Sequence, residues 1–216
     1  MKGQAVVTRV RRVLKDESTT APRWGDALLK DYLYLGQLEI IRAAPFANAS
    51  YRAVELSGGE IRQDFSGEGV VRVLRLVRNM TGSGKGAGPG ISRVSLEELE
   101  RRNLLFQSRP TGGKSDVDHF AMDPFDMKSL FVTPPPVKGS WAEVAVAALP
   151  KAVTSLEDAL SVGEEWATVL QLFVQGWALM EDSPNADYPR GEGFLNQALI
   201  LLGVVKADDN SDEKRS

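Results

Sequence analysis

The sequence predicts an α+β fold, in which four helices, two from each end of the chain, form one bundle that carries a central β-rich insertion. Apolar residues recur at intervals of three and four near both ends, whereas the middle holds short β-branched runs separated by glycine and proline. Helix pairs on either side of a β-rich stretch indicate that the terminal helices pack together. The predicted bounds are residues 1–45 and 161–205 for the bundle, 46–160 for the insertion and 206–216 for a flexible C-terminal tail.

The composition is that of a globular protein, with 43% hydrophobic and 25% charged residues. A chain of 216 residues can bury a full core. It has no cysteine, which excludes disulfides, zinc–thiolate sites, iron–sulfur clusters and thiol catalysis. The formal net charge of −3 disfavours tight binding of nucleic acid. No apolar run reaches the roughly 20 residues of a membrane span, so we expect no membrane association.

The first two helices are predicted from their apolar faces. One face of residues 4–17 carries Val6, Val10, Val13 and Leu14. Pro22 suits the first turn of a second helix, which Pro45 ends. The apolar residues of the second helix fall within one half of a helical wheel and are Leu28, Leu29, Tyr32, Leu33, Leu35 and Ile40.

The insertion begins with a predicted β-hairpin. Residues 51–56 and 61–65 form its strands and Ser57-Gly58-Gly59-Glu60 its turn. A later strand is predicted to end at Pro134-Pro135-Pro136, because proline donates nothing to a ladder. Its apolar residues are Phe120, Phe125, Phe131 and Val132. Residues 141–147 alternate and are predicted to be its partner.

Residues 70–77 are apolar and β-branched enough for a strand. Arg72, Arg75 and Arg78 recur every three residues instead of every two, so a helix remains the alternative. These arginines are a candidate basic strip for DNA phosphates or a subunit interface. The other interpretation is a solvated face.

Residues 82–90 are glycine-rich and are predicted to form a surface loop. Two capping boxes are predicted by spacing alone. Ser95 and Glu98 precede a short polar helix, and Ser161 and Glu164 precede a long apolar one.

The long helix is apolar nearly all round, so other helices or a neighbouring subunit should bury it. Its repeating residues are Trp166, Val169, Leu170, Phe173, Trp177 and Met180. Trp166 and Trp177 are interpreted first as core residues and second as candidate interface residues. A last helix begins near Pro189 and ends near Gly203.

The tail from residue 206 onward is almost wholly polar, and a partner is expected to order it. Its candidate docking residues are Lys206, Asp208, Asp209, Lys214 and Arg215.

No motif for catalysis or cofactor binding is found. Two Gly-Lys stretches invite a phosphate-loop interpretation, but Asn79 and Ser108 stand where that loop needs its first glycine. His119 is the only histidine, and nothing marks a nucleophile beside it. Asp116 and Asp118 lack the glycine and the distant glutamate of a calcium loop. We therefore expect no enzyme, cofactor or metal.

Several short motifs follow one another over residues 24–203. The first part holds Trp24-Gly-Asp-Ala-Leu-Leu29, Tyr32-Leu33, Ile40, Pro45, Val54-Glu-Leu56 and a Ser-Gly-Gly turn. The middle holds Val77-Arg78-Asn79-Met80, Asp123-Pro124 and Phe131-Val132-Thr133-Pro134-Pro135. The end holds the aromatic helix, Ser183-Pro-Asn-Ala-Asp187 and Leu202-Gly203. In order and spacing the chain resembles the head-to-tail adaptors of podovirus-type phages, the portal–tail connectors of the tail tubular protein A-like family. It departs from them at Pro189 and in its long glycine loop.

The resemblance implies a structural virion protein at the head–tail junction, assembled in the host cytoplasm. It implies a homo-oligomeric ring, typically a dodecamer, between the portal protein and the tail nozzle protein. DNA would pass through the lumen without sequence-specific binding. The bundles would pack side by side and the insertion would reach the next component. The alternative is a soluble interaction module that uses its β insertion to hold a partner and forms no ring.

Overall fold

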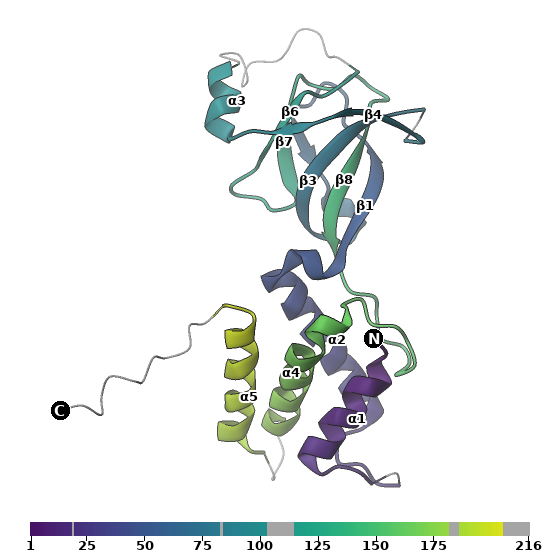
Figure 1. Cartoon of the computed structure of the whole chain (residues 1–216), viewed down its shortest axis with the longest axis vertical. Coiled ribbons are helices and arrows are strands. Elements are labelled where there is room, and N and C mark those ends of the chain that lie inside the picture. The colour runs from purple at the N-terminus through teal and green to yellow at the C-terminus, as the bar shows by residue number, and fades with distance from the viewer. Residues whose placement is uncertain (19, 83, 103–114, 182–185, 205–216) are drawn as a thin grey trace, which may run out of the picture. The chain divides into compact units, whose positions relative to one another are not determined.

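The computed structural model describes residues 1–18, 20–82, 84–102, 115–181 and 186–204. It confirms the predicted α+β class, because helices from both ends of the chain pack together and two four-stranded sheets lie between them in the sequence (Figure 1). The chain divides into two compact units. The helical unit is Met1–Ala47 with the chain from Pro150 onward, and the β unit is Asn48–Leu149.

The helical unit is built around one central helix (Figure 1). Its helices are α1 (Gly3–Leu14), α2 (Asp26–Ala43), α4 (Ala167–Met180) and α5 (Tyr188–Leu201). Helix α4 contacts each of the other three, and its buried residues lie on all of its faces. Two glycines allow close packing: a Cβ would lie 2.6 Å from Leu170 Cδ1 at Gly36, and 2.6 Å from Leu195 Cδ2 at Gly176. The prediction that other helices bury α4 is confirmed.

The segment 150–160, which the sequence placed in the insertion, packs against the helical unit. The carbonyl of Leu156 accepts a hydrogen bond of 2.6 Å from Gln4 N, and Leu160 N donates to the carbonyl of Met1 at 2.9 Å. These contacts tie the chain leading into α4 to the first helix.

Two predictions at helix starts are wrong. The Ser161 hydroxyl accepts a hydrogen bond from Lys151 N and caps no helix, and a short 3₁₀ helix, Glu164–Trp166, leads into α4 instead. Pro22 lies in the α1–α2 connection and not in α2, which begins at Asp26. The first capping serine is confirmed, because Ser95 Oγ accepts from Glu98 N before α3 (Leu96–Arg102).

The β unit contains two sheets. The first has the order β1 (Ala49–Glu55), β8 (Trp141–Ala148), β3 (Val70–Thr81) and β4 (Gly86–Gly90). The second has the order β2 (Arg62–Asp64), β7 (Ser129–Thr133), β6 (His119–Met122) and β5 (Ser92–Arg93). Both sheets contribute to one core, which includes Val73, Leu76, Phe120, Leu130, Val132 and Val144.

The predicted hairpin is wrong, because β1 pairs with β8 and β2 pairs with β7. The buried side chain of Gln63 binds the turn between the two strands. Its Oε1 accepts from Ser57 N at 2.7 Å, and its Nε2 donates to the carbonyls of Ser57 and Glu60 at 3.1 and 2.6 Å. Together with the bond of 3.2 Å from Glu60 N to the carbonyl of Ser57, these bonds hold the turn, while β1 and β2 belong to different sheets.

Two further pairings differ from the prediction. The stretch expected to form one strand before the prolines forms two, β6 and β7, which pair with each other. Strand β8 pairs instead with β1 and β3, as a largely buried strand inside the first sheet. The predicted loop at 82–90 is also partly strand, because its second half is β4, an edge strand on β3.

Strand β3 explains why arginines recur every three residues in a strand. Its register against β8 shifts three times, and at each shift β3 advances two residues while β8 advances one. Each such bulge adds one residue to the two-residue alternation of a strand. Buried residues therefore recur every three positions, and Arg72, Arg75 and Arg78 share one face. The strand prediction is confirmed, and the helix alternative is excluded.

Candidate functional site

The basic strip lies on the face of β3 that points away from the core. Arg72 pairs in register with Ala147, Arg75 with Ala145, and Arg78 with Glu143. Arg78 Nε lies 2.8 Å from Glu143 Oε2 in an ion pair whose angle is not that of a hydrogen bond.

Within the described residues, Arg72 and Arg75 form no ion pair, and both are exposed. On β1 the residue opposite Ala145 is Tyr51, which is 67% exposed. The strip thus offers two available guanidinium groups beside an exposed aromatic ring, a combination suited to acidic or aromatic groups of a partner.

A pocket of about 320 Å³ adjoins this strip along the edge of β3. It is lined by Leu74, Arg75, Ile91, Arg93 and Phe120. Strand β4 pairs only with residues 78–81 of β3. The earlier part of the same edge of β3 is bordered by a loop and by β5, which belongs to the second sheet. Val73 N donates to Met127 O at 2.8 Å on one side of the gap, and Ile91 N donates to Val77 O at 3.1 Å on the other.

The pocket combines apolar and basic chemistry. Ile91 and Phe120 are 4% and 1% exposed, whereas Arg75 and Arg93 are exposed. Neither arginine forms an ion pair with another described residue. Sequence reasoning missed this site because its lining residues come from β3, from β6 and from the segment 91–93, and only the folded β unit brings them to one pocket.

The loop between β6 and β7 presents the most exposed aromatic side chain of the described chain. Phe125 is 97% exposed, and Met127 is 61% exposed. Arg62, on β2, fixes the loop through two ion pairs. Its Nε lies 3.0 Å from Asp123 Oδ2, and its Nη2 lies 2.9 Å from Asp126 Oδ2. The sequence had placed Phe125 in a strand, and this prediction is wrong.

Local hydrogen bonds complete the loop. Asp123 Oδ1 accepts from Phe125 N, and Asp126 Oδ1 accepts from Lys128 N, each at 2.9 Å. Ser129 Oγ donates to Asp126 Oδ2 at 2.7 Å. These bonds from Ser129 and Lys128, together with Arg62, hold the pKa of Asp126 below its ordinary value. The pKa of Arg62 is raised, mainly through its hydrogen bond to Asp123.

The two candidate tryptophans lie in the helical unit, and neither is fully buried. Trp177 stacks on Phe173 with ring centroids 5.2 Å apart and meets Tyr32 at 5.9 Å. Trp166 meets Phe46, which is 70% exposed, at 5.7 Å. Trp177 is thus part of the packing between α2 and α4, whereas Trp166 borders an exposed ring.

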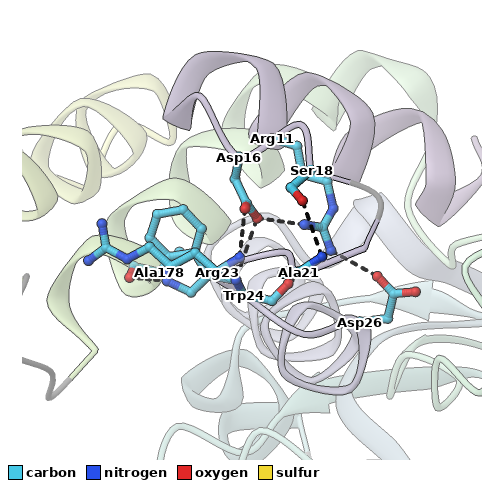
Figure 2. Close-up of polar contacts among 8 residues, drawn as sticks. All are labelled: Arg11, Asp16, Ser18, Ala21, Arg23, Trp24, Asp26 and Ala178. Carbon is cyan, nitrogen blue, oxygen red and sulfur yellow. Dashed lines mark hydrogen bonds and ion pairs between the residues drawn. The ribbon is translucent and has the colours of Figure 1, made fainter.

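The Trp24-Gly-Asp motif is structural. Figure 2 shows the Asp16 carboxylate between the Arg11 guanidinium and the backbone of Arg23 and Trp24, which donate to it at 2.7 and 3.4 Å. Arg11 Nη2 lies 2.9 Å from both the carbonyl of Trp24 and Asp26 Oδ1. This network fixes the connection between α1 and α2.

The structure places His119 in β6, half-buried, and Asp116 and Asp118 in the segment before it. Within the described ranges, no three His, Asp or Glu side chains are grouped so that they could hold a metal ion. The candidate tail residues Lys206, Asp208, Asp209, Lys214 and Arg215 lie outside the described residues. The helices that the structure describes include none long and apolar enough to cross a membrane.

The site candidates are therefore surfaces: the basic strip, the pocket beside it and the Phe125 loop. Comparison with protein-family models and with curated proteins gives no match for this chain.

Proposed function

We propose that this chain is a structural, ring-forming adaptor of a short-tailed phage virion, which joins the portal to the tail nozzle and lines the DNA passage. The observation that carries the proposal is the exposure of large apolar side chains on both units. Phe46 and Leu201 are 70% and 53% exposed on the helical unit, and Phe125 is 97% exposed on the β unit. A connector contacts neighbouring copies and two further components, and such contacts bury apolar and aromatic side chains.

The specific identity rests on the resemblance over residues 24–203. The first motif of this resemblance helps to hold the helical unit together, since Trp24 is buried and its indole N–H donates to the carbonyl of Ala178. A motif that fixes helix packing suits a protein that works by shape and not by catalysis. This supports a structural adaptor with no enzymatic role.

The charge of the chain also supports a conduit for DNA. A formal net charge of −3 gives the lumen of a ring no strong attraction for phosphates. A lumen that bound the duplex tightly would slow its passage through many simultaneous ion contacts. We propose that DNA passes without sequence-specific binding and that residues 206–216 dock on the portal, where many weak contacts add up.

Electron microscopy of the purified protein, alone and mixed with its portal protein, tests the proposal. Stacked rings are the expected result. Portal particles that carry separate protomers, or a chain that stays monomeric over the whole concentration range in sedimentation, would contradict it. The second outcome would favour the interaction module without a ring.

A further inference from the structure

The Phe125 loop, residues 123–128, is fixed in place by contacts within the β unit. Arg62 bridges its two aspartates, and backbone bonds attach it to both sheets: Val73 N donates to Met127 O at 2.8 Å and Phe65 N to Lys128 O at 3.0 Å. A loop fixed in this way loses little conformational entropy when it docks. Its tip nevertheless leaves the Phe125 ring 97% exposed. A fully exposed aromatic side chain on a fixed loop has the properties of an interface anchor.

The residues around the ring indicate what it binds. Phenylalanine gains most from an apolar pocket that removes it from water. The Asp123 and Asp126 carboxylates are both paired with Arg62 of the same chain, and the Asp123 side chain is only 7% exposed, so the loop offers a partner mainly its phenyl ring. The partner that suits this ring is a protein with an apolar pocket and an available cation.

The pocket beside β3 has this chemistry. Its volume of about 320 Å³ exceeds the roughly 150 Å³ that hold a benzene molecule in a protein cavity. Leu74, Ile91 and Phe120 supply an apolar surface, and Arg75 and Arg93 supply guanidinium groups. Arginine stacks favourably on the face of a phenyl ring.

Phe125 does not fill this pocket in its own chain, since almost the whole ring is exposed. We propose that Phe125 of one copy inserts between Arg75 and Arg93 of a second copy. This inference rests on the proposed function and deepens it, because it names a contact between neighbouring copies of the ring. The loop of one copy meets the pocket of another, and head-to-tail contacts of this kind form a ring when the rotation between copies closes.

The test uses the full chain and two variants, one for each side of the contact. Phe125→Ala removes the ring and keeps the pocket, whereas the double variant Arg75→Glu and Arg93→Glu reverses the pocket charge and keeps the ring. Leu149→Ala is the control, because Leu149 is an exposed apolar residue of the same unit, 43% exposed, and lies in neither surface. Circular dichroism and thermal unfolding establish that all variants are folded, which the exposure of the replaced side chains leads us to expect.

Sedimentation velocity over a concentration series measures self-association. We expect each of the two variants to weaken it by at least about tenfold, as the loss of an anchor residue does, and the control to match the wild type. An equimolar mixture of the two variants should form one-to-one pairs, because the ring of one variant still finds the intact pocket of the other.

The outcomes separate this inference from the proposed function. If the wild type assembles and Phe125→Ala assembles equally well, the ring proposal stands and the Phe125 contact is wrong. If the mixed variants form no pairs, the pocket is not the partner surface of Phe125. A wild-type chain that stays monomeric, or stops at a dimer, overturns both the head-to-tail contact and the ring. If Phe125→Ala loses binding to the tail nozzle while its self-association is unchanged, the partner of the Phe125 side chain is another protein. This outcome would overturn the second copy as its partner.

Discussion

The indole Nε1 of Trp24 donates a hydrogen bond of 2.7 Å to the carbonyl oxygen of Ala178, a residue 154 positions later in the chain. Trp24 is 3% exposed, so this bond lies in the core of the helical unit, where it links the α1–α2 connection to α4. Replacing Trp24 with phenylalanine removes the donor and should lower the free energy of unfolding by about 1–2 kcal/mol. Alanine should lower it by about 3–5 kcal/mol, because a cavity is added. Urea denaturation measures both values, and equal stability of the phenylalanine variant and the wild type would show that the bond contributes nothing.

The helices could be predicted from the sequence because their signals are local. The periodicity of α4 lies within fourteen consecutive residues, Ala167–Met180, and its neighbours in the bundle bury it as expected. The strand Val70–Thr81 was also found, but its triplet of arginines was ambiguous until the bulges were known. A bulge depends on which residues of the partner strand lie opposite, and this information is not in the segment itself.

Strand pairing and the candidate surfaces could not be predicted for the same reason. The choice of β8 as the partner of β1 joins residues about a hundred positions apart, whereas a hairpin is the simplest local solution. Arg62 pairs with Asp123 of the Phe125 loop from 61 residues away, and Arg75 and Arg93 line one pocket only in the folded β unit. The sequence shows the two aspartates of this loop, Asp123 and Asp126, but it does not show that Arg62 pairs with both of them.

The two candidate tryptophans should differ in their effect on stability. Trp177 packs on Phe173 and Tyr32, so Trp177→Ala should lower the free energy of unfolding by about 2–4 kcal/mol, less than for a fully buried tryptophan. Trp166 meets the exposed ring of Phe46, so Trp166→Ala should have a smaller effect on the protomer. Thermal melts and assembly assays on the same variants distinguish core from interface. A larger loss of stability for Trp166→Ala would reverse this assignment.

Strand β4 provides a matched pair of glycines. A Cβ at Gly88 would lie 2.8 Å from the carbonyl oxygen of Asn79, whereas at Gly90 the nearest atom, the carbonyl oxygen of Val77, is 3.9 Å away. Gly88→Ala should therefore push β4 from β3 and lower the free energy of unfolding by about 1–3 kcal/mol. Gly90→Ala should change it by no more than about 0.5 kcal/mol. Chemical denaturation compares them directly, and equal effects would contradict the close approach of Gly88 to β3.

Asp126, in the Phe125 loop, should make the stability of the chain depend on pH. Bonds from Ser129, Lys128 and Arg62 hold the pKa of Asp126 below its ordinary value of about 3.9. A carboxyl whose pKa is lowered on folding stabilises the folded chain at pH above its unfolded pKa, and this contribution is lost as the pH falls through the folded pKa. Asp126→Asn removes the charge at every pH. The variant should therefore be less stable than the wild type near neutral pH, and the difference should shrink in acid below about pH 4.

The control for this effect is Glu97→Gln, which neutralises an exposed carboxylate elsewhere in the same unit. Urea denaturation of the three proteins between pH 7 and the acid range gives the difference at each pH. We expect the gap between the wild type and Asp126→Asn to narrow in acid, and the gap for Glu97→Gln to stay small throughout. A gap for Asp126→Asn that does not change with pH would show that the ionised carboxylate does not stabilise the fold through its bonds to Ser129, Lys128 and Arg62. In that case the loop must be held mainly by its backbone bonds to Val73 and Phe65.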